Sequence, residues 1–173
     1  MKKRCVLALI LTALAGTALH FAYDLCPAPL VGLFAPVNES VWEHLKLLFW
    51  PFLAAGFVLT CGQEEKPAAW SGFLLAELLM PLVLLGIYYP LRAGFGVEST
   101  AVDIALYYLV LTFGFWLACR VSASGRLAFA SGVLVILTGL YGAAIILFTL
   151  APPGLPIFLA NTLQIHSFLD FCA

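Results

Sequence analysis

Charged side chains are scarce in this sequence. Of its 173 residues, 10% are Asp, Glu, Lys or Arg, whereas 64% are hydrophobic. A soluble domain typically contains about a quarter charged and about half apolar residues, so water is not the main solvent of this chain. The net charge of −1 and the lack of a basic patch give no reason to expect nucleic acid as a partner.

Sequence signatures of soluble enzymes are also missing. The chain has no Gly-x-Ser-x-Gly elbow, no His-Glu-x-x-His helix, no phosphate-binding Gly-rich loop and no Cys-x-x-Cys pair. Ordinary soluble-enzyme chemistry is therefore not expected, and the sequence assigns no enzyme class.

Long apolar stretches lie between the few charges. A helix needs about 20 such residues to cross the hydrocarbon core of a membrane. We therefore predict a single all-α domain over residues 1–173, a polytopic membrane bundle of about five transmembrane helices embedded in the lipid bilayer. The predicted spans lie near residues 5–23, 45–61, 68–90, 101–119 and 127–150.

The first span begins like a signal peptide. Residues 1–15 combine a basic start with an apolar run that ends at Ala13-Leu14-Ala15. The apolar run continues to Tyr23, which is the full spanning length, so we expect a retained helix instead.

Basic residues predict the orientation of the bundle, because they are enriched on the cytoplasmic side. A cytoplasmic N-terminus and an extracytoplasmic C-terminus place most of them inside. These are Lys2, Lys3, Arg4, Lys66, Arg120 and Arg126, against Lys46 and Arg92 outside.

The C-terminal segment does not read as a sixth span. Residues 152–156 form a Pro-rich break, and residues 157–173 are short for a crossing. A helix there would carry polar side chains on one stripe and apolar side chains opposite. We expect an amphipathic interfacial helix or a re-entrant helix.

The five cysteines divide between the two predicted sides. Cys26 and Cys172 fall outside, where a disulfide is expected to persist. The alternative is that all five cysteines are buried as small apolar side chains.

Ionisable side chains gather toward the predicted outer half. His20 and Asp24 are four residues apart, as are His166 and Asp170. A mixture of imidazole and carboxylate suits a divalent metal such as zinc. The candidate metal ligands are His20, Asp24, His44, His166 and Asp170. The candidate ion-binding or substrate-binding residues are Glu77, Glu39, Glu43 and Asp103.

Each of these residues also has a simpler interpretation. Ser40 and Glu43 have the spacing of a capping box at a helix start. His20, Asp24 and Asp103 lie near a predicted interface, where polar side chains reach water at modest cost.

Glu77 lies near the middle of its span among leucines. A carboxylate there needs a partner, a proton or a cavity. Pro81 follows four residues later and has no N–H to bond the Glu77 carbonyl. Pro51 likewise leaves the Leu47 carbonyl without its helical hydrogen bond. A carboxylate beside a freed carbonyl suits a cation, although a protonated Glu77 bonded to a neighbouring helix is the alternative.

Four stretches carry a family resemblance. They are His20–Asp24, Phe34–Lys46, Val102–Ile104 and Pro152–Pro156. In these stretches the chain resembles an uncharacterised bacterial multi-pass membrane family that carries a domain-of-unknown-function label. The resemblance implies a bacterial inner-membrane setting and no particular activity. A weaker likeness is to the ceramidase-like and adiponectin-receptor-like membrane hydrolases, from which no residue is carried over.

Three functions are compatible with these residues. The first is a small-solute or ion transporter, channel or membrane binding subunit with Glu77 as its mid-membrane site. The second is an accessory subunit that docks a partner membrane subunit or another copy of itself. The third is an intramembrane metal-dependent hydrolase, in which the metal would activate a water molecule.

Overall fold

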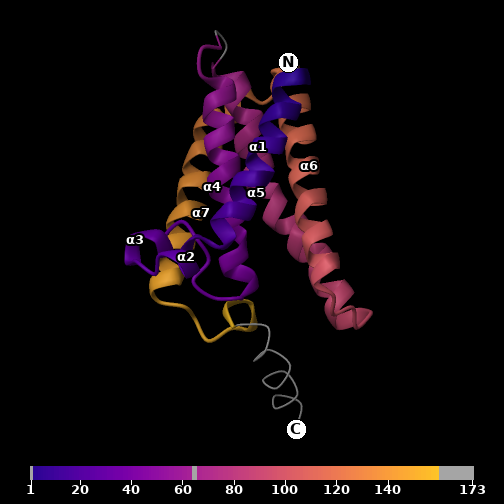
Figure 1. Cartoon of the computed structure of the whole chain (residues 1–173). Helices are drawn as coiled ribbons and strands as arrows, with labels where there is room; N and C mark the ends of the chain where they lie inside the picture. Colours follow the sequence, from indigo (N-terminus) through magenta and orange to yellow (C-terminus); the bar gives the residue numbers. More distant parts are fainter. Residues whose placement is uncertain (1, 64–65, 160–173) are drawn as a thin grey trace.

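The structure is a computed structural model that describes residues 2–63 and 66–159. Five long helices form a bundle (Figure 1). They are α1 (Lys2–His20), α4 (Val41–Thr60), α5 (Lys66–Tyr89), α6 (Thr100–Ser124) and α7 (Ser131–Leu150). The shorter elements are α2 (Ala22–Leu25), α3 (Pro29–Gly32), a π turn at Pro90–Gly94, and 3-10 turns at Ala128–Ala130 and Pro156–Phe158. The described residues contain no strand, so the predicted all-α bundle is confirmed.

Four of the long helices are long and apolar enough to cross a membrane. These segments cover residues 3–20, 66–94, 100–124 and 128–150. Helix α4 carries Glu43, His44 and Lys46 near its start and is not among them. The bundle is therefore compatible with membrane insertion, and its orientation stays a prediction. Most of the predicted C-terminal helix, residues 160–173, lies outside the described residues.

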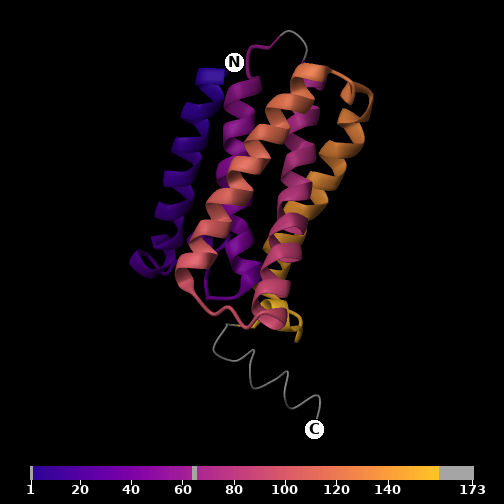
Figure 2. The ribbon, with the colours of Figure 1, turned by 90° about the vertical axis from the view of Figure 1, so that its right-hand side faces the viewer.

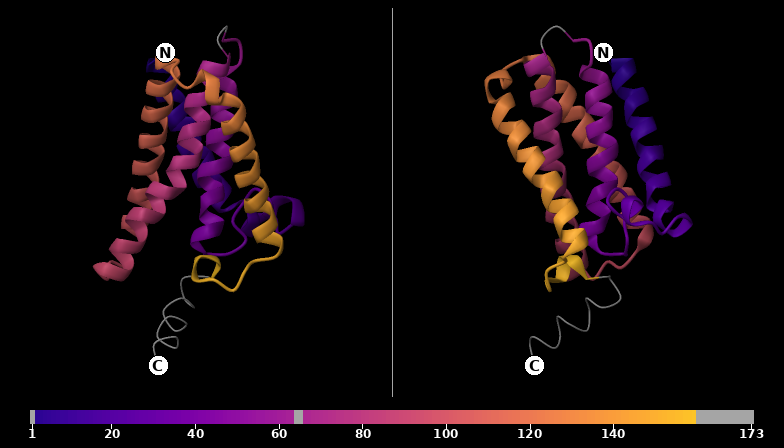
Figure 3. Two further views of the ribbon diagram at one scale, coloured as in Figure 1. Left: turned by 180° about the vertical axis from the view of Figure 1, so that it is seen from behind. Right: turned by 90° about the vertical axis from the view of Figure 1, so that its left-hand side faces the viewer.

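Consecutive long helices run in opposite directions. Figures 2 and 3 show α1 and α7 at opposite sides of the bundle, with α4, α5 and α6 between them. Helix α1 packs on α4 and α6, whereas α7 packs on α4 and α5. The end of α1 and the start of α4 consequently meet at one end of the bundle.

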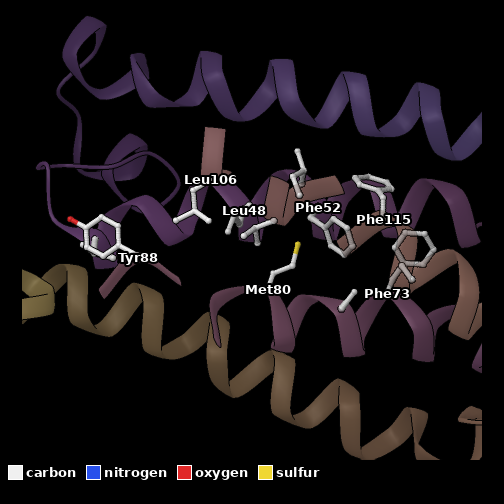
Figure 4. Packing of buried hydrophobic residues seen from close by; sticks show 12 residues of the cluster. Leu48, Phe52, Phe73, Met80, Tyr88, Leu106 and Phe115 are labelled. Carbon is white, nitrogen blue, oxygen red and sulfur yellow. The ribbon is translucent and has the colours of Figure 1, made fainter. Parts of the chain in front are cut away.

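The apolar core lies between α4, α5 and α6 (Figure 4). Phe52 meets Phe115 edge to face, with ring centroids 4.8 Å apart. Met80 is fully buried and fills the space that the missing side chain of Gly114 leaves. Small residues thus let large side chains of the neighbouring helix interdigitate. Close packing of this kind holds helices together in lipid, where the hydrophobic effect does not drive their association.

Pro51 lies inside α4 and cannot donate to the Leu47 carbonyl. Tyr107 of α6 donates its hydroxyl to that carbonyl at 3.4 Å. A neighbouring helix therefore satisfies the backbone oxygen that the proline leaves free.

The expectation that only the outer cysteines could form a disulfide was wrong. Cys5 near the start of α1 and Cys119 near the end of α6 form a disulfide, whereas Cys26 is free and exposed. Helices α1 and α6 pack together in opposite directions, which brings a residue at the start of one to the end of the other. Cys172 lies outside the described residues.

Close packing of α5 on α6 gives a test of the fold. A methyl group on Gly72 would collide with the Ala118 carbonyl and the backbone of Ser122. We expect Gly72→Ala to lower the free energy of unfolding by about 1–3 kcal/mol, the usual cost of overpacking. Thermal unfolding in detergent would measure the change.

Gly139→Ala is the matched control, because nothing lies within 4 Å of the added methyl group. A helical Gly→Ala change without a clash is neutral or stabilising. Equal stability of the two variants would contradict the described contact between α5 and α6.

Candidate functional site

A fully buried lysine holds the loop before α4. Lys46 is 0% exposed. Its ammonium group donates to the carbonyls of Gly32 at 2.6 Å and Ala35 at 3.2 Å, and to Glu43 Oε2 at 2.6 Å. These three acceptors match the three N–H donors of an ammonium group, so the buried charge is fully hydrogen-bonded.

Glu43 extends the same network in two further directions. Its Oε2 accepts from the Val37 N–H at 2.9 Å, and its Oε1 accepts from the Thr149 hydroxyl of α7 at 2.9 Å. Both carboxylate oxygens are thus engaged by the protein itself. This arrangement gives Glu43, predicted as an ion-binding or substrate-binding residue, a framework position that joins the loop, α4 and α7.

Half of the predicted capping box is present. Ser40 caps α4 and accepts from the Glu43 N–H at 3.3 Å. The other half differs, because Asn38 Oδ1 accepts from the Ser40 N–H at 2.9 Å. The Glu43 carboxylate therefore does not accept from the Ser40 N–H and bonds Lys46 and Val37 instead.

Three possible metal ligands converge at the end of the bundle that includes this loop. Each of His20, Glu39 and His44 offers one ligand atom, and these atoms all lie within 4.8 Å of one another. His20 ends α1, Glu39 lies in the loop and His44 lies in the first turn of α4. The two histidines are partly exposed and Glu39 is exposed, so the cluster opens outward.

The spacing of the cluster is close to that of a zinc site. His44 Nε2 lies 3.4 Å from Glu39 Oε2. Ligand atoms about 2.1 Å from a tetrahedral zinc lie about 3.4 Å from each other. The ring of His20 stands edge-on to that of His44 with 5.1 Å between centroids.

His44 is oriented by its other ring nitrogen. Nδ1 lies 2.8 Å from the Ser40 carbonyl oxygen. Because a carbonyl oxygen accepts only, Nδ1 carries the hydrogen, and the lone pair of a neutral ring is on Nε2. Metal-binding histidines typically have such a second hydrogen bond, which fixes the ring for coordination.

The other predicted site residues lie apart from this cluster. Asp24 is exposed on α2 and is not part of it. Asp103 Oδ2 lies 3.6 Å from Arg92 Nη1. Glu77 is buried inside α5, and His166 and Asp170 lie outside the described residues.

A cavity lies at the other end of the bundle. It has a volume of about 640 Å³, lies near the start of α1 and includes Arg4, Cys61 and Ser122 in its wall. None of the predicted site residues lines it. The candidate metal cluster is therefore a surface site and not part of this cavity.

Sequence reasoning did not single out Lys46 as part of the site framework. The available signal was the spacing of Glu43 and Lys46, which are three residues apart and so lie on one face of a helix. A salt bridge at this spacing is usually a solvated pair. Only the loop that folds over α4 makes it a buried one.

The buried ion pair predicts a large effect of a single substitution. Lys46→Met would leave the Glu43 carboxylate buried without its cation. We expect the free energy of unfolding to fall by about 3–5 kcal/mol, the usual cost of removing one partner of a buried pair. Unfolding by a denaturing detergent would measure it.

The matched control is Lys66→Met, since Lys66 is exposed at the start of α5. Such a surface change typically alters stability by at most about 0.5 kcal/mol. If Lys46→Met were equally mild, the network around Lys46 would not hold the loop.

No curated protein and no solved structure matches the chain. A sequence family described as a family of unknown function, DUF6512, matches residues 1–164. This match confirms the resemblance to a family of unknown function, and it covers the helical bundle and the loop that holds Glu39. The chain belongs to the family DUF6512.

Proposed function

We propose that this protein is an integral membrane protein that binds a divalent transition metal of the zinc type. The ligands are His20, Glu39 and His44. The observation that carries this proposal is their convergence from the end of one helix, a loop and the start of another helix within 4.8 Å.

The donor set favours zinc over calcium or magnesium. Two imidazole nitrogens and one carboxylate oxygen suit a borderline-soft ion, whereas calcium and magnesium take oxygen ligands. Sites with three protein ligands keep a position for water or substrate, and those with four are closed. The partly exposed cluster is of the first kind, so its metal is open to exchange or to chemistry.

A second candidate function is transport of a cation through the bundle. The observation that favours it is that Glu77 is 1% exposed and its Oε2 has no hydrogen-bond partner. Charged or polar groups of this kind inside membrane helices mark ion pathways. The cluster at the bundle end would then bind the ion before it passes Glu77.

The metal proposal predicts one zinc ion per chain in protein purified without a polyhistidine tag. Loss of a residue that hydrogen-bonds a metal ligand weakens metal binding by roughly 10–100-fold. His44→Ala and His20→Ala each remove a ligand itself, so each should weaken zinc binding by more than this. Competition with a zinc-sensitive dye would measure the affinity. Acidification should also weaken binding, because imidazole must be neutral to coordinate.

Asp24→Asn is the control, because it removes an exposed carboxylate on α2 that is not one of the three ligands of the cluster. Zinc binding that is unchanged in His44→Ala, or that is lost equally in Asp24→Asn, would refute the assignment.

The transport candidate has a separate test in lipid vesicles that hold a zinc-sensitive dye. Wild-type protein should admit zinc, and Glu77→Gln should abolish the flux while leaving zinc binding at the cluster intact. Absence of flux in the wild type, or flux unchanged by Glu77→Gln, would remove this candidate without affecting the binding proposal.

A further inference from the structure

Glu77 is a buried acidic residue in the middle of α5. It lies midway along Lys66–Tyr89 and is 1% exposed. Its Oε2 accepts no hydrogen bond, and none of the ion pairs among the described residues includes it. This isolation contrasts with Glu43, whose two oxygens are both engaged.

The ionised form of such a group is unfavourable. A charged side chain at the centre of a membrane helix costs about 2.5–3.5 kcal/mol on insertion scales, and an unpaired buried charge costs several kcal/mol. A neutral carboxylic acid avoids this cost and gains an O–H donor. The surroundings of Glu77 therefore favour the form that holds a proton.

Helix α7 packs on α5 and carries the hydroxyl groups of Thr138 and Tyr141. Thr138 lies one turn before Tyr141, is 4% exposed, and its hydroxyl has no hydrogen-bond partner. Tyr141 is the one titratable residue of α7.

Hydroxyl groups suit a carboxyl that changes its protonation state. A hydroxyl accepts from a carboxylic O–H and donates to a carboxylate, so the same pair serves both forms. Two of the three unpartnered buried polar side-chain atoms in the described part of the chain, Glu77 Oε2 and Thr138 Oγ1, belong to this pair of helices. Pro81 adds a nearby backbone oxygen, because it has no N–H to bond the Glu77 carbonyl.

We infer that Glu77 is a proton-binding site inside the bundle, a neutral carboxylic acid that releases and rebinds its proton, on a helix that packs against the one carrying the hydroxyl groups of Thr138 and Tyr141. This inference concerns proton binding at equilibrium. It rests neither on the metal cluster nor on transport.

An apolar carbodiimide tests the inference, because it adds to protonated carboxyl groups in apolar surroundings. The full-length protein in detergent is treated at neutral pH, and the modified residue is located by mass spectrometry. Glu77 is modified in the wild type, and Glu77→Gln loses the modification. Glu98→Gln is the control, because Glu98 is exposed and its removal leaves the modification of Glu77 unchanged.

The dependence of the modification on pH tests the role of α7. Tyr141→Phe and Thr138→Val each remove a hydroxyl that we infer donates to the carboxylate once Glu77 ionises. Each variant therefore raises the pH at which modification is half lost by roughly one unit, the equivalent of one hydrogen bond. An unchanged midpoint in both variants overturns the role of the two hydroxyl groups.

Infrared spectroscopy gives a readout that does not depend on access of the reagent. A protonated carboxyl has a carbonyl band that is lost in Glu77→Gln at neutral pH. Absence of that loss overturns the proton site, even if the reagent fails to reach Glu77. Protection of Glu77 from the carbodiimide by sodium at constant pH also overturns it, because the ligand is then a metal cation.

Discussion

The hydrogen bonding of one buried ammonium group determines the structure at one end of this bundle. Lys46 has no exposed surface and must find acceptors inside the protein. Two of them are backbone carbonyls of the segment before α4, at Gly32, which ends α3, and at Ala35, and the third is Glu43. The loop is therefore fixed on α4 by the charge that it satisfies.

The consequences of this constraint extend to the candidate metal ligands. Glu43 bonds Val37 in the loop and Thr149 on α7, so the loop cannot shift without breaking bonds to two helices. Trp50 adds a bond from its ring N–H to the Leu33 carbonyl. Glu39 follows this fixed segment and consequently reaches His44, which the Ser40 carbonyl orients. The buried ion pair of Glu43 and Lys46 thus supports the partly exposed cluster of His20, Glu39 and His44.

The five long helices could be predicted from the sequence, and the site only in part. Long apolar runs located the helices, four of which are long and apolar enough to cross a membrane. His20 and His44 were predicted as metal ligands and lie together. Asp24 was predicted from its four-residue spacing to His20, but α1 ends at His20 and α2 begins at Ala22, so the two are not on one continuous helix.

Other features depend on contacts that no local pattern contains. Glu39 joins the histidines because the loop folds back over α4. The disulfide between Cys5 and Cys119 depends on the packing of α1 on α6. The isolation of Glu77 was visible in sequence as a carboxylate among leucines, but the hydroxyl groups of α7 lie about 60 residues further along the chain, beyond the reach of helical spacing rules.

The most direct test of the metal site is the X-ray absorption spectrum of the zinc-loaded protein, supported by anomalous scattering from crystals. We expect zinc surrounded by two imidazole nitrogens, one carboxylate oxygen and one further light atom, at about 2.0–2.2 Å. The anomalous peak should lie between His20, Glu39 and His44. Sulfur ligands, or zinc located at any other part of the chain, would contradict the account.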